Sequence, residues 1–464
     1  MIKVKGGEEM NKRIDMTSGP IFSRIVAFTV PLIFTGFLQI FFNMADQAVV
    51  GHFAGRDALS SVGATSSLIH LFVNSFIGLS AGAQVCISHS LGAGDYDRAR
   101  RHAHNAIATS VIVGTLVAIA GIIFARHILT LMKTPAEGGV LDGAVLYMQI
   151  YLGGAPIYML YNYGAAIIKT QGDTKSPFLY LLCGGVLNVI LNLIFVIVFG
   201  MKAEGVAIAT VAANAVSAFL VVRHLIFVDS PCRIEPKYIR PYRNEFSQIM
   251  KKGIPIGLQS ATFSFSNLFI QSSINFLGSA AMAGNTAAVS ISGFTDVFSD
   301  SIGQSTFAFV GQNVGARKYE RVKRVILTAT IAGIIVSAIL GPLVYFFADP
   351  LLQLFIPGDY ESIGYAKIRF FYQLLFMPLA TLMQVLSGSM RAIGKTLPPM
   401  LICVFGVCAF RLLWISFVFP LYPSAACIYM SFPISWAFTD VGLLILLTVF
   451  MRSLKRNFFN KVIE

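Results

Sequence analysis

The sequence predicts an all-α membrane protein whose twelve transmembrane helices form two six-helix lobes related by a parallel pseudo-twofold axis. Three observations predict it: the composition, a series of long apolar stretches and an internal repeat. Of the 464 residues, 56% are hydrophobic and 12% are charged, and the mean hydropathy is +0.72. Soluble domains carry about 25% charged residues. A soluble chain of this length and composition would have too few charged residues to cover its surface. The composition therefore indicates an integral membrane protein and excludes disordered or collagen-like classes.

Twelve apolar stretches come close to the ~20 residues that a helix needs to cross the hydrocarbon core. Several contain Gly or Pro, which membrane helices tolerate when neighbouring helices satisfy the freed backbone groups. No secretory signal peptide is expected, since residues 1–20 are polar. The predicted spans, in chain order, are 25–50, 59–88, 105–125, 144–168, 177–199, 204–227, 250–277, 283–310, 325–347, 363–390, 398–420 and 424–451.

The basic residues that give the net charge of +13 lie mainly in the connections between these spans. When the connections are assigned to alternate sides, 28 of the 35 Lys and Arg residues fall on one side. The positive-inside rule places that side, with both termini, in the cytoplasm. We therefore expect a multi-pass protein of a bacterial cytoplasmic membrane that contacts anionic lipid and binds no nucleic acid.

The chain repeats itself once, at an offset of 222 to 224 residues. SRIVAFTVPL from Ser23 aligns with SQIMKKGIPI from Ser247, and LGAGDYDRARR from Leu91 aligns with VGARKYERVKR from Val314. Pro156 aligns with Pro378. Each half then holds six spans, and because six is even, both halves enter the membrane from the same side. Two such lobes around a central cavity favour a carrier with alternating access over a pore.

The repeat also predicts the domain boundaries. The expected segments are a cytoplasmic N-terminal segment at 1–22, an N-lobe at 23–222, a cytoplasmic linker at 223–248, a C-lobe at 249–452 and a cytoplasmic tail at 453–464.

One candidate site lies in the first half. Asp46 falls late in span 1, and Asn188 and Asn192, four residues apart, share one face of span 5. Thr210 lies in span 6. Carboxylate, amide and hydroxyl oxygens suit a small hard cation, or a proton carrier with its hydrogen-bond shell. The spacing alone leaves two other interpretations open: an interfacial carboxylate at Asp46 and amides that join helices.

A second candidate site lies in the second half. Asp296 and Asp300 are four apart in span 8, and Gln304 continues the stripe. Like charges at this spacing repel, so either one carboxylate is protonated, or Arg411 or a cationic ligand lies between them. A structural ion pair with Arg411 fits equally well, and Asp440 carries the same ambiguity. Each charge at mid-bilayer costs roughly 2.5 to 3.5 kcal/mol, so all of these groups need partners or water.

The sequence carries no motif of a membrane-embedded enzyme. The six cysteines show no CxxC spacing, and neither a Walker lysine motif nor HExxH occurs. We therefore expect no enzyme, no resident cofactor and no use of ATP.

With these residues in place, the chain resembles the multidrug and toxic compound extrusion (MATE) family from about residue 20 to 452. The resemblance depends on ADQAVVGHFAG from Ala45, LGAGDYDRARR, KTQGDTKSP from Lys169 with its partner MRAIGKTLPP, and the NxxxN of span 5. It implies twelve helices in two lobes, and the export of organic cations or amphiphilic drugs and metabolites in exchange for H+ or Na+. It further implies a small amphiphilic or cationic substrate and membrane lipid as the partners, and we expect a monomer.

The resemblance also implies the residues of the site. The residues that match the cation-coupling set are Asp46, Asn188, Asn192, Val206 through its carbonyl, and Thr210, with Na+ as a candidate ion at Asp46, Asn188, Asn192 and Thr210. Members that couple through the second lobe have a glutamate in span 7, but SATFSFSNLF from Ser260 has no acidic residue. Coupling is therefore assigned to Asp46. We expect the substrate to contact Asp296, Asp300, Gln304 and Arg411.

A flippase for lipids or lipid-linked precursors is the alternative, because related folds perform that function. It predicts a basic central cavity, whereas only Arg411 lies clearly within a predicted span.

Overall fold

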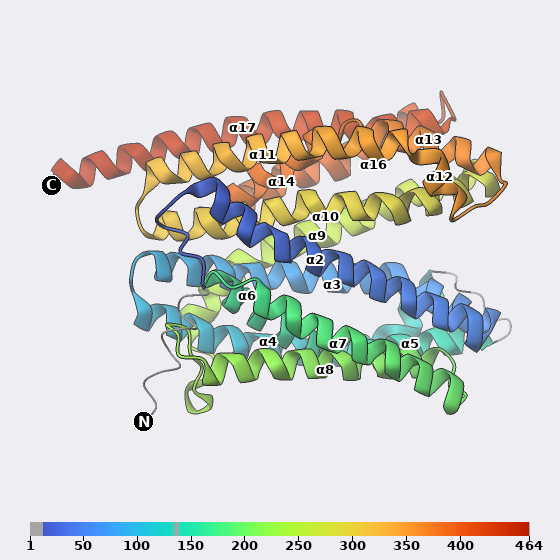
Figure 1. Cartoon of the computed structure of the whole chain (residues 1–464), viewed down its shortest axis with the longest axis horizontal. Coiled ribbons are helices and arrows are strands. Elements are labelled where there is room, and N and C mark those ends of the chain that lie inside the picture. Colours follow the sequence, from blue (N-terminus) through green and yellow to red (C-terminus); the bar gives the residue numbers. More distant parts are fainter. Residues whose placement is uncertain (1–12, 133, 135–138, 464) are drawn as a thin grey trace. The chain divides into compact units, whose positions relative to one another are not determined.

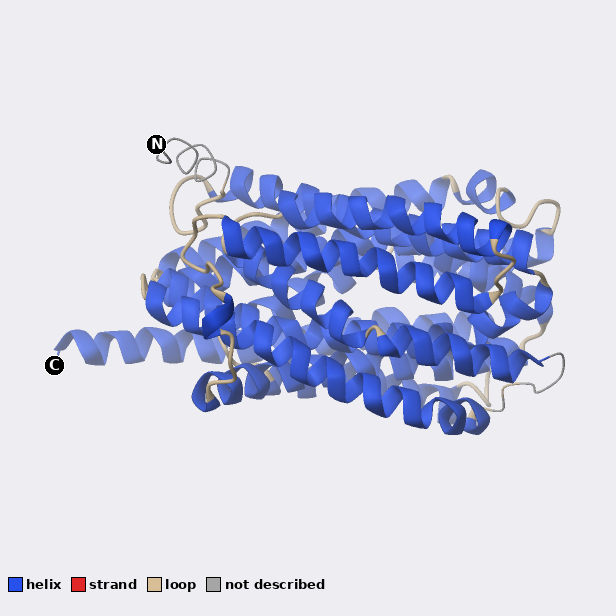
Figure 2. Ribbon diagram, turned by 90° about the horizontal axis from the view of Figure 1, so that it is seen from below, coloured by secondary structure: helices blue, strands red, loops and turns tan. Residues whose placement is uncertain are grey.

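The computed structural model describes residues 13–132, 134 and 139–463. Residues 1–12 of the expected N-terminal segment, and residue 464 of the expected tail, lie outside the described residues. Throughout the described residues every regular element is a helix (Figures 1 and 2). The all-α prediction is confirmed.

The first half of the chain contains six helical spans, three of them built from two consecutive segments. They are α2 (Ile21–Val49) with η1 (Val50–Ala54), α3 (Arg56–Gly92), α4 (Tyr96–Leu131), α5 (Val140–Gly153) with α6 (Ala155–Thr170), α7 (Lys175–Leu193) with η3 (Ile194–Val198), and α8 (Ala203–Phe227).

The second half repeats this order. Its elements are α9 (Arg243–Phe276), α10 (Ser279–Gly315), α11 (Tyr319–Phe346), the short α12 (Ala348–Gln353), α13 (Tyr360–Leu374) with α14 (Met377–Ala392), the run α15 (Leu397–Cys403), η5 (Val404–Ala409), α16 (Phe410–Leu413) and η6 (Trp414–Val418), and α17 (Ala425–Ile463).

Among the described residues, eight helices are long and apolar enough to cross a membrane, or ten if each bent pair counts as one span. The two other predicted spans are α9 and α10, which have 34 and 37 residues but are more polar. Serine, threonine, Asp296 and Asp300 lower the hydropathy of α10. Together these segments account for the twelve predicted spans.

The two bent pairs lie at matching places in the repeat. α5 and α6 meet at 43°, and α13 and α14 meet at 46°. In both pairs a proline, Pro156 or Pro378, occupies the first turn of the second helix. Proline has no backbone N–H and clashes with the preceding turn, so it breaks the helix at that point.

The chain divides into two compact units. Unit 1 comprises Phe34–Gly257 with the segment that ends at Asp15, and unit 2 comprises Met16–Ile33 and Leu258–Glu464. α2 and α9 therefore each begin in one unit and end in the other. Each contains a proline shortly before the change, Pro31 in α2 and Pro255 in α9.

The beginning of α2 is held in unit 2 by polar and aromatic contacts. Thr29 and Ser305 hydroxyls lie 2.7 Å apart, and the rings of Phe28 and Phe309 meet edge to face. Asn313 Nδ2 donates to the carbonyl of Met16 over 2.9 Å.

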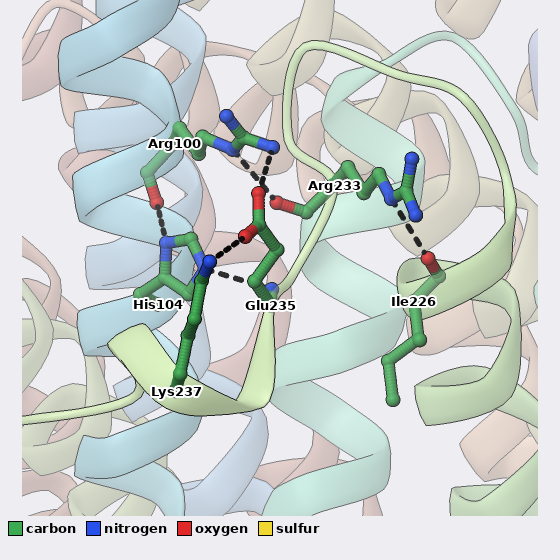
Figure 3. A network of polar contacts seen from close by, with 6 residues as sticks. All are labelled: Arg100, His104, Ile226, Arg233, Glu235 and Lys237. Atoms are coloured by element: carbon green, nitrogen blue, oxygen red, sulfur yellow. Dashed lines mark hydrogen bonds and ion pairs between the residues drawn. The ribbon is translucent and has the colours of Figure 1, made fainter.

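The segment between α8 and α9 is fixed to unit 1 (Figure 3). Arg100 Nη2 donates to Glu235 Oε1 over 2.7 Å, and His104 Nε2 accepts the backbone N–H of Glu235 over 2.9 Å. Cys232 and Ile234 belong to the hydrophobic core of this unit. Burial raises the pKa of the Cys232 thiol to about 12. The connection between the repeats is thus an ordered part of unit 1.

Candidate functional site

Asp46 lies in the last turn of α2, immediately before the π-helical turn η1, and its side chain is half-buried in unit 1. Asn192 Nδ2 donates to Asp46 Oδ1 over 2.5 Å. The carboxylate therefore contacts the amide pair of α7. It does not lie apart from the amides, as a carboxylate that only extends to water would.

The two amides continue the network toward α8. Asn192 Nδ2 also lies 3.4 Å from Asn188 Oδ1, and Asn188 Nδ2 donates to Thr210 Oγ1 over 3.2 Å. Thr210 Oγ1 in turn donates to the carbonyl of Val206 over 2.8 Å. The five residues that the sequence indicated in the first half thus form one connected chain of polar atoms.

The local sequence explains why these groups meet. Four-residue spacing puts Asn188 and Asn192 on one face of α7, and both are buried. A Cβ on Gly185 would lie 1.7 Å from the ring of Phe42, which precedes Asp46 by one turn. Glycine at this position therefore lets α2 pack closely against α7. The π-helical turn η3 begins two residues after Asn192, and such turns are frequent at functional sites.

Three tyrosines beside this network were missed by the sequence analysis. Tyr147, Tyr151 and Tyr158 are buried, with ring centroids 6.3 Å apart in the first pair and 4.7 Å apart in the second. All three lie close enough to Asp46 to interact with it electrostatically. The four-residue spacing of Tyr147 and Tyr151 was the available signal.

This arrangement offers oxygen atoms to a proton or a small cation. Asn192 Oδ1 is buried, and within the described part of the chain it has no hydrogen-bond partner. No ion pair of the described residues involves Asp46. One carboxylate, two amides, one hydroxyl and one carbonyl therefore fit H+ or Na+ by their chemistry. The described residues contain no group of three His, Cys, Asp or Glu that would hold another metal.

The acidic stripe of α10 lies in unit 2. Asp296, Asp300 and Gln304 are exposed along one side of the helix. Gln373 Nε2 of α13 donates to Asp296 Oδ2 over 3.3 Å, and Gln384 Nε2 of α14 donates to Asp300 Oδ1. Each carboxylate thus has a neutral amide partner of its own.

Arg411 does not join this stripe, and the alternative of an ion pair between Arg411 and Asp296 or Asp300 is not found among the described residues. Its side chain is only 5% exposed, and its Nε donates to Ser435 Oγ over 3.0 Å. The guanidinium carbon lies 4.0 Å from the ring centroid of Phe432. The reason is local packing, because α16 places Arg411 against the aromatic face of α17.

Two further charged residues of unit 2 are Arg369 and Asp440. Arg369 is in α13, where its Nε donates to Gln373 Oε1 over 2.9 Å. Asp440 is 3% exposed, and neither of its carboxylate oxygens has a hydrogen-bond partner in the described residues. Asp440 is therefore no partner of Arg411 either.

Comparison with known proteins gives one consistent result. The MatE family profile matches residues 31–194 and 255–421, which are the two repeats. "Probable multidrug resistance protein YoeA" of Bacillus subtilis is 26% identical over 391 residues, covering 82% of this chain and 83% of that protein. "Probable multidrug resistance protein NorM" of Thermotoga maritima is 24% identical over 394 residues, covering 84% and 83%.

A solved structure with the same fold is described as an "outward-facing conformation of a multidrug resistance MATE family transporter of the MOP superfamily". It superposes with a TM-score of 0.88 at 21% identity, covering 96% of this chain and 99% of that chain. At this level of identity the similarity establishes the fold.

Proposed function

Because the chain belongs to the MatE family of multi-pass membrane transporters, we propose that it is a secondary active antiporter. It exports organic cations or amphiphilic drugs and metabolites, and it takes up H+ or Na+ in exchange. The observation that carries this proposal is the contact of Asp46 with Asn192, at the end of the polar chain that runs to Val206. The chain is a transporter and not an enzyme.

The protein lies in a bacterial cytoplasmic membrane as a monomer, with both termini in the cytoplasm. The support for this orientation is the excess of Lys and Arg on one side of the spans.

Asn192 couples ion binding to a change of structure. While Asp46 is a carboxylate, it accepts a hydrogen bond from Asn192 Nδ2. A protonated Asp46 is a donor, and Asn192 Oδ1, which is buried and has no partner among the described residues, becomes its acceptor when the amide turns over. Bound Na+ requires the same reorientation, because its ligands are oxygen atoms. Ion binding thus rearranges the contacts between α2 and α7.

Antiport requires that the ion and the substrate stabilise different conformational states of the protein. A ligand that binds both states with equal affinity does not change their populations. Neutralising Asp46 removes a charge from a half-buried position and favours the state with low substrate affinity. At a membrane potential of ~100 mV, each net positive charge that moves inward supplies ~2.3 kcal/mol, or about a fifty-fold concentration ratio. Exchange of one ion for a monovalent organic cation moves no net charge, so the concentration gradient of the ion drives it. The potential adds to this when the substrate is neutral or when more than one ion enters per cycle.

The exposed stripe of Asp296, Asp300 and Gln304 supplies the acidic contact for a cationic substrate in unit 2. Its carboxylates accept hydrogen bonds from amides. Arg369 and Arg391 are close enough to interact with them electrostatically, but neither carboxylate forms an ion pair within the described residues. Both are exposed and therefore accessible to a ligand.

The test is ethidium transport in proteoliposomes that contain the purified protein. We expect Asp46→Asn to abolish gradient-driven transport while the protein still elutes as a single folded species, because the amide cannot exchange a proton and binds Na+ weakly. Asp349→Asn is the matched control, since Asp349 pairs with Lys367 at the surface. Full transport by Asp46→Asn would remove Asp46 from the mechanism. A pH gradient and a Na+ gradient, applied separately to wild-type protein, identify the ion.

A further inference from the structure

Unit 2 contains two guanidinium groups that share one aromatic ring. The guanidinium carbons of Arg411 and Arg369 lie 4.0 and 5.9 Å from the centroid of Phe432. The two groups are close enough to interact electrostatically. Like charges held this near to each other in an apolar protein interior are costly unless something compensates them.

The neighbours of these groups compensate the two charges only in part. Arg369 donates to the neutral amides of Gln373 and Asn285, and Arg411 donates to the hydroxyl of Ser435. No ion pair of the described residues includes either arginine. Asp296 is linked to Arg369 through the amide of Gln373 and is also close enough to interact with it electrostatically. Among the described residues, no carboxylate is placed in this way beside Arg411.

One donor of Arg411 is left over. Its Nη2 has no hydrogen-bond partner among the described residues, and only 5% of the side chain is exposed, so water at the surface does not reach this donor. A buried donor without a partner is rare and calls for an explanation. A guanidinium presents its N–H groups as a planar fork that matches the oxygen atoms of a carboxylate or phosphate.

We propose that Arg411 and Arg369, with the ring of Phe432 between them, form an oxyanion site that binds the carboxylate or phosphate of an aromatic substrate. Tyr429 and Trp436 flank Phe432, with ring centroids 6.2 and 5.8 Å from it. They offer apolar surface to the ring that carries the anion. The inference deepens the proposed function, on which it rests, by adding substrates with an anionic group to the cationic ones.

The sequence provides a reporter for this site. Its two tryptophans are Trp414 and Trp436, and the ring of Trp436 lies 5.7 Å from the guanidinium carbon of Arg411. Fluorescence excited at the red edge of the tryptophan band therefore reports binding beside Arg411 in the purified full-length protein. The matched probes are 3-phenylpropionate and 3-phenylpropanamide, which differ in charge and hardly absorb there.

We expect 3-phenylpropionate to change the emission saturably and 3-phenylpropanamide to bind at least about tenfold more weakly, as for the loss of a charge-assisted contact. Arg411→Gln and Arg369→Gln each weaken binding of the acid by about tenfold, and Arg411→Lys weakens it less. Arg324→Gln, the same change at an exposed position of α11, has no effect. Equal affinities for the acid and the amide, or unchanged binding by both glutamine variants, would overturn the proposal. If Arg411→Gln does not fold, Arg369→Gln decides.

The oxyanion could also belong to a lipid headgroup, so the titration is repeated in nanodiscs. Phosphatidylglycerol added to phosphatidylcholine discs would compete with 3-phenylpropionate only if its phosphate enters the site, and Arg411→Gln would remove that competition. Competition of this kind would support the oxyanion site and identify a lipid headgroup as its ligand. If phosphatidylglycerol does not compete, the ligand is the aromatic substrate.

The binding assay uses no ion gradient, so a loss of 3-phenylpropionate binding can be distinguished from a loss of ion-driven transport. Asp46→Asn should lose transport and keep 3-phenylpropionate binding.

Discussion

The same positions of the two repeats carry opposite chemistry. α7 and α15 begin at Lys175 and Leu397, and α8 and α17 begin at Ala203 and Ala425, so the offset in this region is 222 residues. At this offset, Phe410, Trp414 and Phe432 stand where unit 1 has Asn188, Asn192 and Thr210, and Arg369 stands where it has Tyr147. Unit 1 places neutral amide and hydroxyl groups beside a carboxylate, whereas unit 2 places aromatic rings beside two cations.

The backbone arrangement, in contrast, is shared. A Cβ on Gly184 would lie 2.0 Å from Ser217 Oγ in unit 1, and a Cβ on Gly406 would lie 2.3 Å from Thr439 Oγ1 in unit 2. These four residues are equivalent at the same offset. The difference teaches that helix packing was kept in both repeats while the side chains at the site diverged, which gives each unit its own ligand.

The strongest test of this comparison moves the carboxylate. Ile270 occupies the place of Asp46 in the second repeat, at an offset of 224. We expect Asp46→Asn with Ile270→Asp to remain at background transport, because unit 2 offers no amide pair at the equivalent positions. Ethidium transport in proteoliposomes measures it, with Asp46→Asn alone as the reference. Recovery of transport would mean that the two units are interchangeable.

A smaller effect is expected from the amide that contacts Asp46. Asn192→Leu leaves the carboxylate without its donor, and a lost hydrogen bond to a charged group costs about 1.5 to 3 kcal/mol. Transport should fall by roughly tenfold or more, while 3-phenylpropionate binding in unit 2 stays unchanged. Asn192→Asp should retain more transport than Asn192→Leu, since it keeps an oxygen ligand. Equal losses in both variants would indicate that Asn192 only packs.

The shared packing is tested by stability. Gly184→Ala and Gly406→Ala should each destabilise the protein by about 1 to 3 kcal/mol through overpacking. Thermal unfolding in detergent measures both, and the shifts should be similar. A large shift in one variant only would show that the two packings are not equivalent.

The smallest effect concerns the start of two matching helices. Asp359 caps α13 by accepting the backbone N–H of Ser362 over 3.0 Å, whereas α5 begins after Gly139 without a side-chain cap. Hydrogen bonds from Ser362 hold the pKa of Asp359 below its ordinary value. The contribution of this cap is therefore present above the ordinary carboxyl pKa and is lost as the pH falls through the folded-state pKa.

Asp359→Ala should accordingly lower the unfolding temperature slightly at neutral pH and not at strongly acidic pH. Asp359→Asn should keep an unfolding temperature close to that of the wild type, because Asn also caps helices. A shift that does not depend on pH would indicate that the carboxylate charge plays no part.

Much of the fold could be predicted because its causes are local or periodic. Apolar length gives the spans, and the repeat gives their order. Asp46 and the amide pair could be singled out as candidates because an intramembrane carboxylate is costly and four-residue spacing defines a helix face. Their assignment to one site came from the family resemblance.

The remainder depends on contacts between distant parts of the chain. Arg411 could not be separated from Asp296 and Asp300 by sequence, since the aromatic residues that hold it lie on α17. The position of Arg369 over Phe432, and the burial of Cys232 and Ile234 in unit 1, likewise follow from tertiary packing.

That α2 and α9 each begin in one unit and end in the other has a consequence for biosynthesis. Residues 16–33 leave the ribosome early, yet their partners in unit 2 come much later, as the 297-residue separation between Asn313 and Met16 illustrates. The start of the first helix must therefore wait, inserted but unpacked, until most of the polypeptide has been translated, and contacts of such long range slow folding. Conversely, unit 1 is incomplete until residue 257 has emerged. A nascent chain stalled between the repeats would complete neither bundle, so we expect quality-control proteases to recognise it.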